Sequence, residues 1–122
     1  MVLDMEFIKS GEKNEVSENI LKIVPYQKID QTNANIFADI LLTLIKGGVR
    51  KMVIDFSEIN YIDSSGIGKI INITKVIRKL GGNVTITRCN EKIMEILSLV
   101  KLDTFIKFFA SNEEGINYLQ FL

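Results

Sequence analysis

The spacing of apolar residues along the chain predicts four helices and five strands in alternation. Three long stretches carry apolar residues three and four positions apart, the spacing of one helical face, and a fourth begins with a serine and a glutamate at capping-box spacing. Short apolar runs between them are typical of strands. The predicted helices cover residues 30–46, 64–80, 90–100 and 111–122. The predicted strands cover residues 1–10, 18–24, 51–56, 83–87 and 104–109.

This order of elements indicates a single α/β domain over residues 1–122. Strands that alternate with helices form a mainly parallel sheet with right-handed crossovers. The first two strands, separated by a turn at 11–14, are expected to add an antiparallel hairpin at its edge. Glycine pairs at 47–48 and 81–82 end the first two helices. The predicted helix caps are Asp30 or Thr32, then Asp63 or Ser64, then Asn90 and Ser111.

The segment YIDSSGIG, residues 61–68, places two hydroxyls, a carboxylate and two glycines at the start of a helix. In α/β folds of this kind, sites for ligands and partners lie beyond the carboxyl ends of the strands. A capped helix start explains one carboxylate or hydroxyl here, but it does not explain two serines and two glycines together. The segment is therefore the first candidate for chemistry.

Three chemical interpretations of the segment fail on its spacing. A hydrolase elbow requires a glycine two residues before its serine, and Ile62 and Asp63 stand there instead. The run GIGK at 66–69 lacks the spacing of a phosphate-binding loop. Asp55 ends a strand as in a receiver domain, but the acidic pair of such domains is absent. A helix start does favour a negative group, because its N–H groups are unpaired, so a regulatory phosphoserine remains.

The composition of the chain excludes several further classes of function. Fifteen basic and fifteen acidic residues cancel, which argues against nucleic-acid binding. The absence of histidine removes Ser-His-Asp and Cys-His catalysis and most zinc chemistry. No apolar run approaches the ~20 residues of a membrane helix, and no secretory signal is visible. The single cysteine, Cys89, fits a reducing cytosol. We therefore expect a cytoplasmic protein without a metal or cofactor.

The stretch VIDFSEINYIDSSGIG, residues 53–68, resembles the central signature of the STAS domain, specifically of the bacterial anti-sigma-factor antagonists. The similarity rests on Asp55-Phe56-Ser57 and on the segment at 61–68. The later segments GGNVTI and ILSLVKLDTFIKFFASNEEGINYL also look like the family's later strands and terminal helices. The resemblance covers roughly residues 15–120.

This resemblance implies a partner-switching regulator that is not itself an enzyme. In such antagonists the first serine of the pair is phosphorylated by the anti-sigma factor, a serine kinase, and a phosphatase restores the active form. The unphosphorylated antagonist captures the anti-sigma factor and frees the sigma factor. By this resemblance Ser64 is the acceptor, although the helical period alone does not separate it from its neighbour. The partner-binding surface is expected to include Asp30, Asp63, Ser64, Ser65, Gly66, Gly68 and Asn72.

One position departs from the family pattern. The family often has a glycine three residues before an acidic residue in the loop after an early strand, and Gln27 stands there, ahead of Asp30. Asp30 is expected near Ser64, because both loops follow strands on the same side. The alternative function is a STAS-type scaffold or ligand-sensing module in another signalling assembly, and an enzyme that hydrolyses or binds nucleotides is the third class. We expect a monomer or weak dimer.

Overall fold

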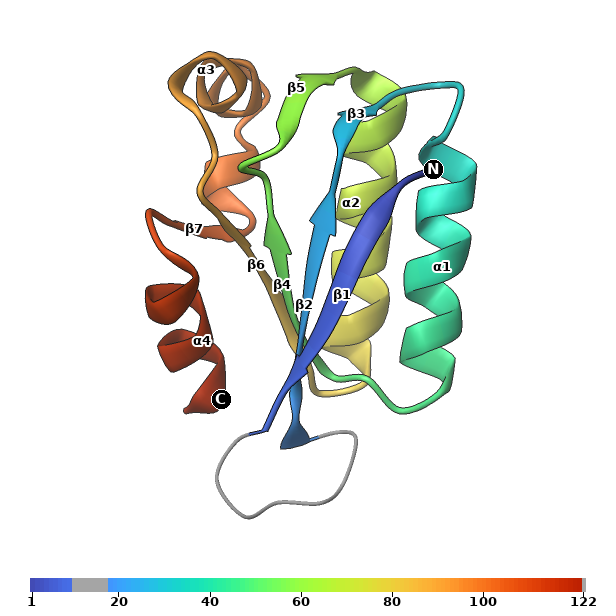
Figure 1. Ribbon diagram of the computed structural model, residues 1–122, viewed down its shortest axis with the longest axis vertical. Coiled ribbons are helices and arrows are strands. Elements are labelled where there is room, and N and C mark those ends of the chain that lie inside the picture. The colour runs from blue at the N-terminus through green and yellow to red at the C-terminus, as the bar shows by residue number, and fades with distance from the viewer. Residues whose placement is uncertain (10–17, 122) are drawn as a thin grey trace.

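A five-stranded sheet forms the centre of the protein, and helices cover both of its faces (Figure 1). The computed structural model describes residues 1–9 and 18–121, so the predicted turn at 11–14 lies outside the described residues. The strand order is β1-β2-β4-β6-β7, with β1 antiparallel to β2 and the other neighbours parallel. These strands are β1 (Leu3–Ile8), β2 (Ile20–Pro25), β4 (Lys51–Asp55), β6 (Asn83–Thr87) and β7 (Lys107–Phe109). The α/β class, the mainly parallel sheet and the antiparallel edge hairpin are confirmed.

The helices divide between the two faces of the sheet. α1 and α2 lie side by side on one face, and α4 packs on the other against β2, β4, β6 and β7 (Figure 1). α3 lies apart from these helices, against β5 and a short 3₁₀ turn at Leu102–Thr104. The bounds of the helices are α1 (Ala34–Lys46), α2 (Ser64–Lys79), α3 (Glu91–Leu99) and α4 (Asn112–Gln120).

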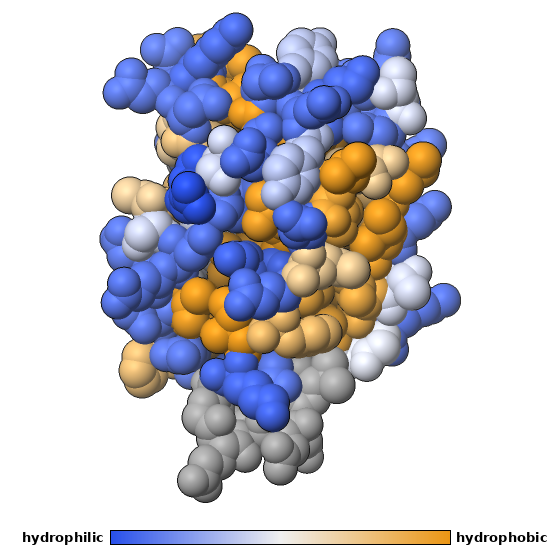
Figure 2. Space-filling model, in the orientation of Figure 1, coloured by the Kyte–Doolittle hydropathy of each residue, from blue (hydrophilic) through white to orange (hydrophobic). Residues whose placement is uncertain are grey.

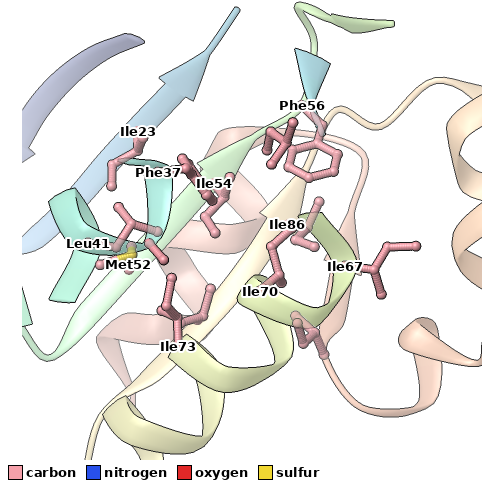
Figure 3. Close-up of a cluster of buried hydrophobic side chains, with 14 of the residues drawn as sticks. Ile23, Phe37, Leu41, Met52, Ile54, Phe56, Ile67, Ile70, Ile73 and Ile86 are labelled. Carbon is pink, nitrogen blue, oxygen red and sulfur yellow. The ribbon is translucent and has the colours of Figure 1, made fainter. Parts of the chain in front are cut away.

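The larger core fills the space between the sheet and the α1–α2 layer (Figure 3). Phe37 and Leu41 of α1 meet Ile70 and Ile73 of α2 there, and all four are fully buried. A smaller cluster on the other face contains Ile20, Val53 and Leu119. Strand β4 is buried along its whole length, because its side chains point alternately into the two clusters.

Two short parallel strands form a second sheet that the sequence pattern did not predict. They are β3 (Gln27–Ile29) and β5 (Ile59–Ile62), which continue beyond the carboxyl ends of β2 and β4 (Figure 1). In β5 only the two outer residues are buried, so its sequence shows no alternation to recognise. The second sheet matters because it carries the chain into the loops that precede α1 and α2.

Two predicted boundaries are wrong, whereas three predicted caps are confirmed. The first helix begins at Ala34 with Asn33 at the cap position, because the side chain of Asp30 accepts its hydrogen bond from the Thr32 N–H and not from the helix. The last strand covers only Lys107–Phe109, since part of the predicted range forms the 3₁₀ turn. The other three helices are capped by Asp63, Asn90 and Ser111, each accepting a hydrogen bond from the backbone N–H three residues later.

Asp55 fastens the carboxyl end of β4 to the loop that follows and to α4. Its side chain is almost fully buried, and it accepts hydrogen bonds from the Ser57 backbone N–H at 2.8 Å and from Asn112 Nδ2 at 2.9 Å. Arg88 Nη1 lies 3.3 Å from the same carboxylate. Burial is the largest influence on the pKa of Asp55 and raises it, but the hydrogen bonds and the Arg88 charge together hold the pKa below its ordinary value.

Replacing Asp55 with alanine is expected to lower the free energy of unfolding by about 3 kcal/mol, because the Ser57 N–H, the Asn112 amide and the half-exposed Arg88 lose their buried acceptor. Because the pKa of Asp55 is lower in the folded protein than in the unfolded chain, the charged carboxylate stabilises the fold at pH values above the unfolded-state pKa. This stabilisation is lost as the pH falls through the folded-state pKa. Urea unfolding at a series of pH values should therefore show the deficit of the variant shrinking below about pH 4.

The matched control is Asp39→Ala, which removes an exposed carboxylate from α1. We expect a change within about 0.5 kcal/mol for this variant. A deficit for Asp55→Ala that stays constant from neutral to acidic pH would show that the carboxylate charge is not what stabilises this junction.

Candidate functional site

Asp63 joins the start of α2 to the loop that precedes α1. Its Oδ1 accepts a hydrogen bond from the Gly66 backbone N–H at 3.1 Å, which caps α2. Its Oδ2 accepts one from the Gln31 backbone N–H at 3.0 Å, and its own N–H donates to the Ile29 carbonyl at 3.3 Å. Both carboxylate oxygens are therefore used inside the protein, and the loops after β3 and β5 are held side by side.

Ser64 is the first residue of α2, and its side chain is exposed. Its hydroxyl makes no hydrogen bond within the described part of the chain, and neither does that of the half-buried Ser65. The backbone N–H groups of the first helical turn have no partner inside the helix, apart from the Gly66 N–H that Asp63 takes. The site thus presents a free hydroxyl beside unpaired N–H groups at the positive end of a helix.

The two glycines of the segment serve different purposes. A Cβ atom at Gly66 would lie 2.5 Å from the Ile29 carbonyl oxygen and 2.9 Å from its side chain, so close packing requires glycine there. A Cβ atom at Gly68 would meet nothing within 4 Å. Gly68 is exposed on α2, so no internal contact explains its lack of a side chain.

Asp30 is buried, and its side chain organises its own loop. It accepts hydrogen bonds from the N–H and hydroxyl of Thr32, and it lies 3.1 Å from Lys28 Nζ. The hydrogen bond from the Thr32 hydroxyl is the main cause that lowers the pKa of this carboxyl, with Lys28 adding to it. The neighbouring Gln31 contacts Asp63, which brings this loop to the start of α2. A contact between Asp30 and a partner stays a prediction.

Asn72 lies two helical turns after Ser64, about 12 Å along α2. It is exposed, as are Gly68, Lys75 and Lys79 on the same helix. These residues lie three and four positions apart and form a polar arc on α2 that faces solvent. Its use by a partner stays a prediction.

The rest of the described chain offers no competing chemical site. No group of three or more potential metal ligands occurs among residues 1–9 and 18–121. Cys89 lines an open groove beside α3, but burial raises the pKa of its thiol to about 11, so it is protonated near neutral pH. Within the same residues no helix combines the length and the apolar character needed to cross a membrane.

Comparison with known proteins places this site in a family. The model of the STAS domain matches residues 13–115 of the chain. The chain belongs to the STAS domain family. The resemblance seen in the segment at 61–68 is thereby confirmed.

Several STAS relatives carry functional names. A Thermotoga maritima protein named "Putative anti-sigma factor antagonist" is 28% identical over 102 residues, which cover 83% of this chain and 90% of the relative. A crystal structure from Thermotoga maritima, described by the same words, has a TM-score of 0.81 at 24% identity and covers 95% of this chain and 94% of its own. The Bacillus cell fate determinant SpoIIAA in its phosphorylated form has a TM-score of 0.64 at 17% identity, covering 93% and 98%. At these identities the two structures show a shared fold.

Gln27, the position at which a departure from the family pattern is expected, has an unusual backbone conformation in this STAS domain. Its φ is 70°, in the left-handed region that glycine tolerates best, and its N–H donates to the Glu58 carbonyl at 2.9 Å. The backbone at Gln27 therefore has the shape that favours glycine, which fits the expected departure. Only the structure shows that Gln27 belongs to β3 beside the site.

Tyr61 is a surface residue of the site that sequence reasoning did not single out. It lies in β5, its side chain is 51% exposed, and its pairing partner in β3 is Lys28. The sequence pattern did not predict the second sheet that carries Tyr61, so it gave no signal that this side chain faces solvent.

The two glycines give a matched pair of alanine variants. Gly66→Ala should lower the free energy of unfolding by about 3 kcal/mol or more, because the new methyl group overlaps the Ile29 carbonyl. Gly68→Ala should raise it by about 0.5–1 kcal/mol, because alanine favours the helix and fits into open space. Urea unfolding of both proteins measures the difference, and equal effects of the two substitutions would contradict the separate roles.

Proposed function

We propose that this STAS domain is an anti-sigma-factor antagonist whose binding is controlled by phosphorylation of Ser64. The observation that carries the proposal is the free, exposed hydroxyl of Ser64 at the start of α2, next to an aspartate whose two oxygens are already bonded. Support also comes from the names of the relatives and from SpoIIAA, which has been solved in a phosphorylated form.

In this proposal the protein is a kinase substrate and a binding module rather than an enzyme. The unphosphorylated form binds the anti-sigma factor, a serine kinase, and so releases the sigma factor. Transfer of the γ-phosphoryl group of ATP to Ser64 ends that binding: the Ser64 oxygen bonds to phosphorus, the bond to ADP breaks, and the hydroxyl proton leaves. A phosphoserine phosphatase reverses the change by hydrolysis. The whole cycle takes place in the cytoplasm.

The fold can accept this phosphate with little strain. Free N–H groups and the positive end of α2 attract it, which is worth about 0.3–1 kcal/mol at an exposed site. The Asp63 carboxylate repels it, but that carboxylate is held by two backbone N–H groups and need not move. At a partner interface the same phosphate is costly, because docking strips water from a dianion that has no matching charge.

The first test is phosphorylation. Each serine-kinase anti-sigma factor encoded in the same genome should be purified and incubated with this protein and ATP. We expect one of them to add a single phosphate to Ser64, as mapped by mass spectrometry, and we expect no labelling of Ser64→Ala. Ser65→Ala is the matched control and should be labelled normally. Mapping to Ser65, or no labelling by any of these kinases, would reject the proposal.

The second test separates binding from folding. Calorimetry should give an affinity for the anti-sigma factor at least about a hundredfold weaker when Ser64 is phosphorylated, because an unpaired buried charge costs several kcal/mol. Ser64→Asp should reproduce part of this loss, since it carries less charge. Melting temperature and circular dichroism should hardly change. Equal affinities of the two forms, or loss of the native spectrum on phosphorylation, would rule out a charge switch.

A further inference from the structure

We propose that Tyr61 is the aromatic anchor through which the kinase domain of the anti-sigma factor binds this protein, an inference that rests on the function proposed above. Tyr61 leaves about half of its side chain exposed, at 51%, and its hydroxyl makes no hydrogen bond within the described residues. Tyrosine is enriched among the few residues that dominate binding energy at interfaces, because it buries a large ring at low entropic cost.

Tyr61 is so near Ser64 in the chain that a kinase bound at Ser64 is expected to contact it. Tyr61 and Ser64 are three positions apart in the sequence, and at most about 3.6 Å per residue puts their Cα atoms within about 11 Å of each other. An interface of standard size covers about 800 Å² on each partner, which corresponds to a disc of about 16 Å radius. A kinase that encloses the Ser64 hydroxyl therefore has a footprint wide enough to include an exposed ring at position 61.

The second sheet holds this ring on a fixed support. β5 pairs with β3 in parallel, and Tyr61 lies opposite Lys28, which is itself paired with Asp30. The hydrogen bond from the Gln31 N–H to Asp63 then connects the loop after β3 to the start of α2. The anchor, the charged pair and the proposed phosphorylation site are thus carried by segments of the chain that are bonded to one another. A partner suited to these segments offers an apolar pocket for the ring with polar groups around its rim.

Among the exposed aromatic side chains, Phe7 lies away from these segments. Figure 2 shows apolar residues gathered over β1 and α1, whereas the upper end of the molecule, where β3 and β5 lie, is mainly hydrophilic. Phe7 of β1 is 50% exposed, but it pairs with Leu21 near the beginning of β2, at the opposite end of the parallel strands from Ser64. It therefore provides an aromatic control with the same exposure and a different location.

The test uses the purified kinase that phosphorylates Ser64 in the experiment above. We expect Tyr61→Ala to weaken its binding at least tenfold by calorimetry, and Phe7→Ala to change it less than about twofold. Tyr61→Phe should stay within about threefold of the wild type, because the ring area carries the contact. In phosphorylation assays Tyr61→Ala should raise KM at least about tenfold and leave kcat within about twofold, since the reacting hydroxyl is unchanged.

A measurement on the wild-type protein covers the case in which Tyr61→Ala fails to fold. Hydroxyl-radical labelling of Tyr61 should fall severalfold in the complex, while labelling of Phe7 stays the same. Wild-type affinity of Tyr61→Ala, equal losses for both alanine variants, or unchanged labelling of Tyr61 would overturn the inference and leave phosphorylation of Ser64 intact. Absence of any kinase for Ser64 would instead remove the proposed function, and this inference with it.

Discussion

The candidate site depends on one carboxylate that serves two loops. Asp63 closes the first turn of α2 through the Gly66 N–H and holds the loop before α1 through the Gln31 N–H. Two charge-assisted hydrogen bonds to backbone donors fix both the position and the direction of the helix start. The close approach of Gly66 to Ile29 follows from the same contact, since these loops can pack together only where one residue has no side chain. What remains unused at this junction is the hydroxyl of the next residue, Ser64.

On the other face of the sheet, the carboxylate of Asp55 also joins separate segments of the chain. Asp55 joins β4 to Asn112, the first residue of α4, and to Arg88 after β6. The carboxylate of Asp55 is buried and lies beside the half-exposed Arg88, whereas Asp63 is partly exposed and its carboxylate accepts from backbone N–H groups. The carboxylate of Asp63 bonds to the Gly66 and Gln31 backbones, and that of Asp55 bonds to Asn112 of α4. A phosphate on Ser64, as proposed, is therefore expected to change the surface at the start of α2 and to leave the attachment of α4 to the sheet unchanged.

The sequence predicted the elements that have a long periodic pattern and failed for those that do not. Three helices were found with their caps, because Asp63, Asn90 and Ser111 stand directly before an apolar period. The cap of α1 was misplaced because Asp30 and Thr32 are favoured cap residues too and stand just before Asn33, which caps without a side-chain hydrogen bond. β3 and β5 have three and four residues, which is too few for alternation to appear. The choice of Ser64 came from the family motif, because both serines flank the polar arc of α2.

Gln27 lies near the candidate site but takes no part in the hydrogen bonds that set the site's geometry. A non-glycine residue at φ 70° costs of order 1 kcal/mol, and pairing within the small sheet, together with the Gln27 N–H bond to Glu58, offsets that cost. Gln27 belongs to β3, the strand that carries Lys28 opposite Tyr61, whereas both oxygens of Asp63 bond to the Gly66 and Gln31 backbones. The residues that set the geometry of the candidate site are thus distinct from the residues of the second sheet beside it. If a partner binds the second sheet, as proposed for Tyr61, a change at position 27 is expected to alter which partner binds without altering the geometry around Ser64.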